Sequence, residues 1–493
     1  MTDKNNGLRR VIIEAGKEQE WNLPESLLKQ FESLESLTFL DYPLLSKEKL
    51  NDAVIDNLLR KVCEHLKENN FVIRDYHKLI NDPIHGTVYL HPVALVMMST
   101  PQFQRLHYIK QLSTKYYVYP SASYSRFEHS VGTYHLAGKL INTIKDQQPE
   151  LKISAIDAMC VQLAGLCHDL GHGPFSHMFD KVTKTLDISD WSHEMASTKM
   201  VDLIWEKKKK EFTMWGFTEE NKEFIKSLIK PNLNEILPER SYLYEIVSNC
   251  ESGMDVDKWD YLVRDSFHLG IKCGFDPYRL IYHQRVLSVG KERKICYRDK
   301  EANTISSMFH TRFDLHQKAC QHRVVVGIEL QVAEALQKAA SSGALTVDKK
   351  SLIQCLEDRD MEAYTHLDDG IFSKILESEG EALNESRDLL QHLQERQIWK
   401  FVAEARIEAM IDLGEGVHSE EFDEILRRLT ENCQRQFRWA ETDMNFGKKD
   451  KNPLDYIWFY SKESSNPPFL LKDKGKRLYI LPKEFQHRTA DFD

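Results

Sequence analysis

Residues 163–180, LAGLCHDLGHGPFSHMFD, decide the fold class of this chain. They close a stretch of helical periodicity that begins at Ala155, and the glycines and proline at 171–174 end that helix. The adjacent pair His168-Asp169 stands where the helix ends. Neutral imidazole and ionised carboxylate both bind divalent metals, and neighbouring residues can reach the same ion. The stretch predicts a mainly α protein with a metal site at the end of an apolar helix.

Two more ligands are expected from other segments. RFEHS (126–130) supplies His129, and DVDKWDY (255–261) supplies Asp257. Alone, such a histidine is more often a cap or a surface residue, and such an aspartate is more often an ion-pair partner. Their order around the pair, H…HD…D, is the pattern of HD-domain metal phosphohydrolases. The sequence therefore predicts a metal site formed by His129, His168, Asp169 and Asp257.

Composition excludes several classes of protein. The chain has 493 residues, 41% hydrophobic and 29% charged, which is enough to form a core and excludes general disorder. A net charge of −10 argues against a general nucleic-acid coat. The longest strictly apolar run near the motifs, 93–98, is far too short for a membrane span. With no apolar leader at the N-terminus and no CxxC pair, we expect a soluble, intracellular protein with reduced thiols.

Periodicity predicts the organisation of the chain. Apolar residues recur every fourth position from Leu50 to Leu66, and aromatic, β-branched runs at 454–460 and 477–481 predict strands. A break between helices is expected at 378–381, where Gly380 lies. The expected domains are an N-terminal helical extension (1–72), an HD-type catalytic core (73–340), a helical extension (341–435) and a small mixed α/β lobe (436–493).

Several long motifs resemble one known family, the deoxynucleoside triphosphate (dNTP) triphosphohydrolases built from a sterile alpha motif and an HD domain. The resemblance runs from about residue 75 to 482. It implies hydrolysis of a dNTP to deoxynucleoside and inorganic triphosphate, and homo-oligomers (dimer or tetramer) assembled by nucleotide activators. It also implies control of dNTP pools, an antiviral role in innate immunity, and residence in the nucleus, with the cytoplasm as the alternative. The motifs are KLINDPIHG (78–86), TPQFQRLHYIKQL (100–112), RFEHSVG (126–132), LAGLCHDLGHGPFSHMFD (163–180), LYEIVSN (243–249), DVDKWDYLVRD (255–265) and MFHTR (308–312).

The resemblance also assigns roles to individual residues. It implies one transition metal (Fe, Mn or Zn) at the predicted ligands, and Mg with the triphosphate. His177 would protonate the leaving 5′ oxygen, and His172, oriented by Asp180, would assist. The residues matched to the reacting α-phosphate are His172, His177, Asp180 and His193. Those matched to phosphates are Arg126, Lys258, Tyr261, Arg312 and His316, and those matched to the deoxyribose are Gln111, Leu112, Asp265 and Gln321. Those matched to allosteric nucleotides are Lys78, Asn81, Arg279, Arg298 and Lys300.

The sequence departs from the family pattern at several positions. The leader does not match a sterile alpha motif, and the basic C-terminal segment of family members is expected to be missing. Residues 405–410 replace a basic activator-binding stretch. Cys320 replaces a tyrosine under the deoxyribose, which predicts weaker sugar discrimination. Ser99 and His107 replace an aspartate and an arginine that read guanine, which predicts activity without a strict GTP requirement.

Two other functions remain open on the sequence. One is an HD-type nucleotidase or phosphodiesterase. The cationic residues Arg126, Lys258 and Arg312 favour a triphosphate substrate over the substrates of such an enzyme. An arginine of this kind can also be a structural ion-pair partner. The other is a regulator that binds nucleotides or, weakly, single-stranded nucleic acid and retains little catalysis. The lysine run 207–210 supports it, although a solvated helix face explains that run better. The complete metal-ligand set argues against it.

Overall fold

The computed structural model describes residues 78–188 and 190–402, with the shorter segments 427–428, 430–431, 437–438, 446–448, 451–463 and 467–475. The described part is mainly helical, which confirms the predicted fold class. The predicted helix at 50–66, the stretch 405–410 and the predicted strand at 477–481 lie outside the described residues. In the part of the chain that is described, no helix is both long enough and apolar enough to span a bilayer.

Two long helices form the centre of the HD region. Helix α5 (Arg126–Gln147) begins with a capping box, in which Ser125 and Glu128 satisfy free N–H groups of the first turn. Helix α6 (Ala155–Cys167) packs along α5 on one side and α9 (Glu219–Ile229) on another. Because neighbours cover it on two sides, α6 buries apolar residues over most of its surface rather than along one stripe.

Helix α11 (Val256–Leu269) packs against α5 and α13 (Ala302–Leu315). The Asp255 carboxylate caps its first turn by accepting from the Lys258 N–H. Its end is set by Gly270, whose φ of 67° lies in the left-handed region that glycine adopts without a side-chain penalty. The first turn of α11 lies beside the first turn of α5, since Asp257 Oδ1 is 3.1 Å from His129 Nε2.

Helices α7 (His177–Thr185) and α8 (His193–Met214) follow the HD motif. The lysine run 207–210 lies in the second half of α8, which is interrupted by non-helical backbone at Lys208. Lys207 and Lys209 are exposed and form ion pairs with Glu362 and Glu219. These contacts confirm a solvated helix face.

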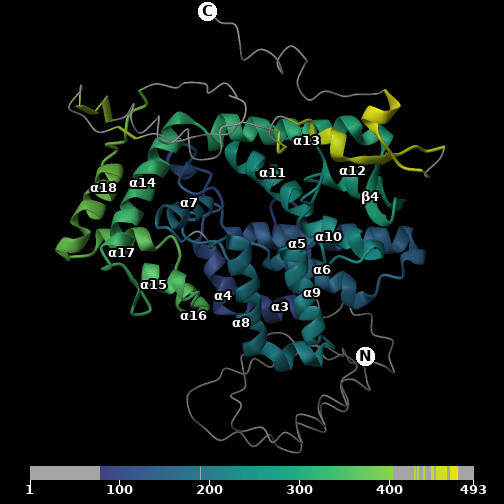
Figure 1. Ribbon diagram of the computed structural model, residues 1–493, viewed down its shortest axis with the longest axis horizontal. Coiled ribbons are helices and arrows are strands. Elements are labelled where there is room, and N and C mark those ends of the chain that lie inside the picture. The colour runs from purple at the N-terminus through teal and green to yellow at the C-terminus, as the bar shows by residue number, and fades with distance from the viewer. Residues whose placement is uncertain are drawn as a thin grey trace, which may run out of the picture. The chain divides into compact units, whose positions relative to one another are not determined.

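Helices α14 (Arg323–Ser341), α15 (Leu352–Glu357), α16 (Met361–Tyr364), α17 (Ile371–Leu376) and α18 (Asn384–Gln394) lie together to one side of this centre, at the left of Figure 1. Helix α14 lies beside α18 and also contacts α7. The predicted break near Gly380 is confirmed, because α17 ends at Leu376 and a 3₁₀ turn starts at Glu381. The other helices are α3 (Pro92–Met98), α4 (Pro101–Gln104), α10 (Ser241–Val247) and α12 (Pro277–Tyr282).

Three small sheets accompany the helices in the described part of the chain. Strands β1 (Lys78–Asp82) and β2 (Gly86–Leu90) form one, and β5 (Thr346–Val347) and β6 (Lys350–Ser351) form another. The third has the order β3-β4-β7-β8: β3 (Gln284–Val289) and β4 (Glu292–Arg298) pair antiparallel, and β4 pairs parallel with β7 (Trp458–Tyr460). Strand β8 (Phe469–Leu470) completes it.

The predicted strand at 454–460 is confirmed only at Trp458–Tyr460, because Pro453 starts a 3₁₀ turn before it. The described strands of the predicted C-terminal lobe thus complete a sheet whose other strands lie in the predicted core. The domain boundaries themselves stay predictions.

Candidate active site

The four predicted metal ligands come from the ends of three helices. His129 lies in the first turn of α5, Asp257 in the first turn of α11, and His168 at the C-cap of α6, with Asp169 directly after it. His129 Nε2 lies 3.2 Å from His168 Nε2 and 3.1 Å from Asp257 Oδ1. His168 Nε2 lies 3.4 Å from both Asp257 Oδ1 and Asp169 Oδ1. The structure brings all four together although the sequence separates them widely.

These separations fit a metal ion. Donor atoms about 2.0–2.1 Å from a tetrahedral ion lie about 3.3 Å from one another. Such close approach of imidazole and carboxylate atoms, with three of the four side chains almost fully buried, suits two neutral histidines and two carboxylates around a divalent cation. The cluster can therefore hold a metal, and its donor set does not select among Fe, Mn and Zn.

The second nitrogen of each ligand histidine is held by another group. His168 Nδ1 lies 2.8 Å from the Gly165 carbonyl oxygen, to which it can only donate. His129 Nδ1 lies 2.8 Å from Asp260 Oδ2. Each contact places the proton on Nδ1 and leaves the Nε2 lone pair for a metal. In the described chain without a metal, burial lowers the pKa of His129, but hydrogen bonds to Asp257 and Asp260 outweigh burial and raise the pKa to about 10.

Asp260 is the centre of a buried network that the sequence did not reveal. Arg264 donates to both of its oxygens at 2.9 Å, and His85 Nε2 lies 2.6 Å from Oδ1. The same Arg264 donates to Asp82 at 2.9 Å, which ties the first hairpin to α11. The sequence signal for this ion pair was the four-residue spacing of Asp260 and Arg264, which places them on one face of the helix that carries Asp257. Their other partners, His85, His129 and Asp82, could not be predicted because they lie far away in sequence.

A second cluster joins the residues matched to the reacting phosphate. Ligand atoms of His172, His177, Asp180 and His193 all lie within 4.8 Å of one another. Asp180 Oδ2 lies 2.8 Å from His193 Nδ1 and 3.5 Å from His177 Nδ1. His172 stacks on His193 with ring centroids 3.9 Å apart, and its Nε2 lies 3.4 Å from Asp169. Asp180 thus orients His193 and His177 directly, whereas the sequence analysis expected it to orient His172.

The loop between the two clusters has an unusual backbone. Phe175 and Ser176 both have positive φ, 58° and 60°, a conformation that costs free energy for residues other than glycine. Asp369 compensates by accepting from the N–H groups of Phe175 at 2.6 Å and Lys110 at 2.9 Å. Ser176 adds a hydrogen bond to the Lys110 carbonyl at 2.6 Å. Asp369 is a second residue that sequence reasoning missed.

Arg105 also holds the loop that follows His168-Asp169. Its guanidinium is buried and donates to the carbonyl oxygens of Leu170 at 2.7 Å, His172 at 2.5 Å and Leu367 at 3.2 Å. Burial is the main reason why the pKa of Arg105 is lowered. The residue lies inside a quoted motif, but no local pattern showed that it would hold the HD loop.

Arg126, Lys258 and Tyr261, three of the residues matched to phosphates, lie near the first cluster. Arg126 is buried, bonds Asp169 through Nη1 and Ser176 through Nε at 2.8 Å, and leaves Nη2 without a partner in the described structure. Lys258 lies 2.8 Å from Asp255. Burial raises the pKa of Tyr261 to about 12, while the nearby charges of Arg312 and Lys258 oppose the shift. The arrangement gathers positive charge beside the metal ligands.

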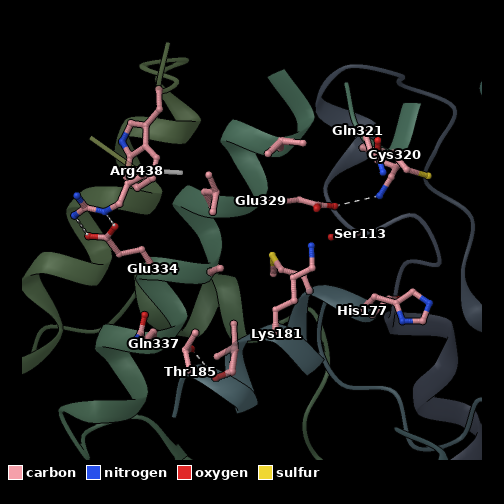
Figure 2. Close-up of a pocket in the computed structure, with 18 of the residues that line it drawn as sticks. Ser113, His177, Lys181, Thr185, Cys320, Gln321, Glu329, Glu334, Gln337 and Arg438 are labelled. Atoms are coloured by element: carbon pink, nitrogen blue, oxygen red, sulfur yellow. Dashed lines mark hydrogen bonds and ion pairs between the residues drawn. The ribbon is translucent and has the colours of Figure 1, made fainter. Parts of the chain in front are cut away.

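A cavity of about 920 Å³ opens next to the second cluster (Figure 2). Of the predicted residues, His177, His316, Gln111 and Gln321 line it, together with Cys320. The cavity continues along α14 as far as Glu334 and Arg438, which lie well away from His177 in Figure 2.

Two residues matched to the deoxyribose do not line this cavity. Leu112 is buried, and Asp265 accepts from the Tyr124 hydroxyl. Burial raises the pKa of Asp265 to about 6.

The residues matched to allosteric nucleotides lie in two places. Arg279 donates to the buried Glu301 at 2.6 and 2.8 Å, and Lys300 lies 3.8 Å from the same carboxylate. Arg298 directly precedes the 3₁₀ turn Asp299–Glu301, which contains both Lys300 and Glu301. Lys78 and Asn81 are exposed on β1. An activator role for these residues stays a prediction.

Comparison with known proteins agrees with this geometry. A family model described as an HD domain matches residues 126–265, the segment that carries all four candidate metal ligands. The fold and the site together define the chain as a hydrolase of the HD class.

Three curated relatives, all named deoxynucleoside triphosphate triphosphohydrolase SAMHD1 or its homologue, extend the match over most of the chain. The chicken protein is 40% identical over 84% of this chain and 71% of its own length. The human protein is 38% identical over 90% of this chain and 75% of its own length. The Dictyostelium discoideum homologue is 32% identical over 96% of this chain and 88% of its own length. The chain belongs to the SAMHD1 family.

Proposed function

We propose that this protein hydrolyses deoxynucleoside triphosphates to deoxynucleoside and inorganic triphosphate. One observation carries the proposal: the His-Asp ligand cluster adjoins the buried Arg126 and, through Asp169 and His172, the second histidine cluster, whose His177 lines a cavity of nucleotide size. Relatives whose names state this activity support it, since they match most of the chain. The gathering of Arg126, Lys258 and Arg312 favours a triphosphate over a monophosphate.

The roles of the side chains follow from their positions. A metal in the first cluster would supply Lewis-acid polarisation of the α-phosphoryl group and activation of water. The side chain of His177 is 71% exposed at the start of α7 and lines the cavity, so it can reach the leaving 5′ oxygen and protonate it. Asp180 holds His177 and His193 in place. Arg126 Nη2 remains to donate to a phosphate oxygen.

The finer features belong to the same proposal. The resident metal is Fe, Mn or Zn, and Mg accompanies the triphosphate. Nucleotides binding near Lys78, Asn81, Arg279, Arg298 and Lys300 act as activators of a dimer or tetramer. The protein lowers dNTP pools in the nucleus and thereby restricts viral replication. Family membership and the retained residues support these features.

The test is the double variant His168→Ala/Asp169→Ala, assayed for metal content and for hydrolysis of dGTP. Removing two of four ligands leaves no adequate site, so metal content and turnover should both be lost while the fold is kept. The matched control is Lys207→Ala/Glu362→Ala, which removes two charged groups from a surface ion pair. A double variant with one equivalent of metal and wild-type turnover would show that the site is elsewhere.

Product analysis separates the reaction from other HD-type reactions. Release of inorganic triphosphate and deoxyguanosine supports the proposal. Release of single phosphates from dGTP, or hydrolysis only of monophosphates or phosphodiesters, would indicate the nucleotidase or phosphodiesterase alternative instead.

A further inference from the structure

A path of hydrogen bonds begins at the candidate metal ligand His129 and continues well beyond Asp260. His129 Nδ1 lies 2.8 Å from Asp260 Oδ2, and the other oxygen of this carboxylate, Oδ1, lies 2.6 Å from His85 Nε2. His85 Nδ1 in turn lies 3.0 Å from the Tyr278 hydroxyl oxygen, which lies 3.1 Å from His135 Nε2. We call these five side chains the His129 path. Tyr278 thus reaches a metal ligand through two intervening side chains.

Three separate elements bring the outer members of the path together. His85 lies in the turn between β1 and β2, where Asp82 accepts from its backbone N–H at 2.8 Å. Tyr278 lies in the first turn of α12, and the Asp276 side chain, which caps this helix, accepts from its N–H at 2.9 Å. His135 lies on α5. Each side chain is therefore held by an anchored backbone, so the path is a defined part of the fold.

The three aromatic rings at the outer end of the path also pack on one another. His85 stacks on His135 with ring centroids 5.3 Å apart and an interplanar angle of 25°. Tyr278 meets both rings edge-on, at centroid distances of 6.0 and 6.2 Å. The side chain of His85 is only 1% exposed. Because this packing fixes the rings and excludes solvent from His85, water does not readily replace a partner that is removed.

The protons along the path follow from the carboxylate at its inner end. The Asp260 carboxylate only accepts, so His85 donates to it through Nε2. A neutral imidazole that donates through Nε2 accepts at Nδ1, and the Tyr278 hydroxyl is the donor there. Burial raises the pKa of Tyr278 to about 12, so this hydroxyl keeps its proton. That proton is then used, so His135 Nε2 donates to the hydroxyl oxygen. Burial is the main reason why the pKa of His135 is lowered to about 4, which keeps its ring neutral near pH 7. Every donor on the path therefore points toward Asp260.

This arrangement explains how a hydroxyl far from the metal ligands acts on them. Without the Tyr278 hydroxyl, His85 Nδ1 is a buried nitrogen with no partner, which costs free energy. The ring relieves that cost by rotating toward another donor, which weakens its bond to Asp260 Oδ1. The same carboxylate holds His129 through Oδ2. Since the outer partner of a ligand histidine sets its tautomer and its orientation, the disturbance reaches the metal.

We propose that Tyr278 is a positioning residue of the metal site, and that it acts on His129 through His85 and Asp260. The inference rests on the metal site of the proposed function. A purely structural contact between the β1–β2 turn and α12 is the alternative, and it predicts lower stability with unchanged metal affinity. A positioning role predicts weaker metal binding in a protein that remains folded.

The test is Tyr278→Phe in the full-length protein, which removes only the hydroxyl group. Zn²⁺ is the probe, and its affinity is measured by competition with a chelator of known affinity. Removing a direct partner of a ligand histidine weakens metal binding about 10- to 100-fold, and Tyr278 lies further out, so we expect a smaller loss of about three- to tenfold. Tyr282→Phe is the matched control, because Tyr282 lies on the same helix, is exposed and is not part of the path. The zinc affinity of this control should equal that of the wild type.

A second comparison shows whether the effect passes through the path. In an Asp260→Asn background the path is already interrupted, so adding Tyr278→Phe should weaken zinc binding no further. If Asp260→Asn does not fold, as judged by thermal unfolding, His85→Gln serves as the background with the same expectation. Unchanged zinc affinity of Tyr278→Phe, or the full loss in the interrupted background, overturns the inference.

Failure of the inference and failure of the proposed function give different results. A wild type that binds zinc but releases no inorganic triphosphate from dGTP overturns the proposed function alone. A wild type whose zinc binding is unaffected by His168→Ala/Asp169→Ala lacks the metal site, which overturns both.

Discussion

Replacing Asp260 with asparagine tests whether the buried network positions a metal ligand. The Asp260 carboxylate is fully buried and accepts from His129 Nδ1 at 2.8 Å, from His85 at 2.6 Å, and from Arg264 twice at 2.9 Å. In Asp260→Asn, only one oxygen remains, and an amide N–H group faces either Arg264 or a histidine. Loss of such an outer partner typically weakens metal binding about 10- to 100-fold, or about 1.4–2.7 kcal/mol. We expect that loss here, together with lower turnover.

The assay is competition for the metal against a chelator of known affinity, with metal content measured by elemental analysis. Asp314→Asn is the matched control, because Asp314 forms an exposed ion pair with Lys318 and lies outside the network. Thermal unfolding of both variants separates weaker metal binding from loss of fold. A folded Asp260→Asn protein that binds metal as tightly as the wild type would refute the positioning role.

Three further predictions concern other parts of the molecule. Burial raises the pKa of Glu245 to about 7, so the charged form of this side chain destabilises the fold. The free energy of unfolding should therefore fall as pH rises from about 4.5 through 7, by at most about 3 kcal/mol. Urea unfolding at pH 5 and pH 8 measures this loss, and Glu245→Gln should remove it. Gly171→Ala should displace α8 and lower kcat at least tenfold, because the new Cβ would lie 2.2 Å from the His193 carbonyl oxygen; wild-type kcat would contradict this. Ser99 and His107 predict dATP hydrolysis without GTP, measured together with oligomer mass; tetramers and activity only with GTP would refute it.

The sequence was sufficient for the class of fold, and it indicated four candidate metal ligands that the structure brings close together. The reason is local: His168-Asp169 ends an apolar helix, and His129 and Asp257 lie in motifs at the starts of two others. Capping residues and turn residues indicate in the sequence where a helix begins and ends, so a residue can be placed at a helix end before the packing of the helices is known.

The supporting contacts could not be predicted in the same way. His129 and Asp260 are separated by 131 positions, and Phe175 and Asp369 by 194. No local spacing links such residues, because packing of helices brings them together. The contacts of Asp180 show the same limit: its neighbours in sequence include both His172 and His177, but its closest histidine nitrogen is Nδ1 of His193, 13 positions further along the chain.

The convergence of helix ends also has an electrostatic consequence. Helices α5, α11, α7 and α8 all present their first turns to the two clusters, through His129, Asp257, His177 and His193. Each N-terminus carries roughly half a positive charge from its aligned peptide dipoles. Helix α6 instead presents its C-terminus, the negative end, at His168. The backbone alone therefore creates a positive field for a polyanion and a negative end for a cation, inside a chain whose net charge is −10.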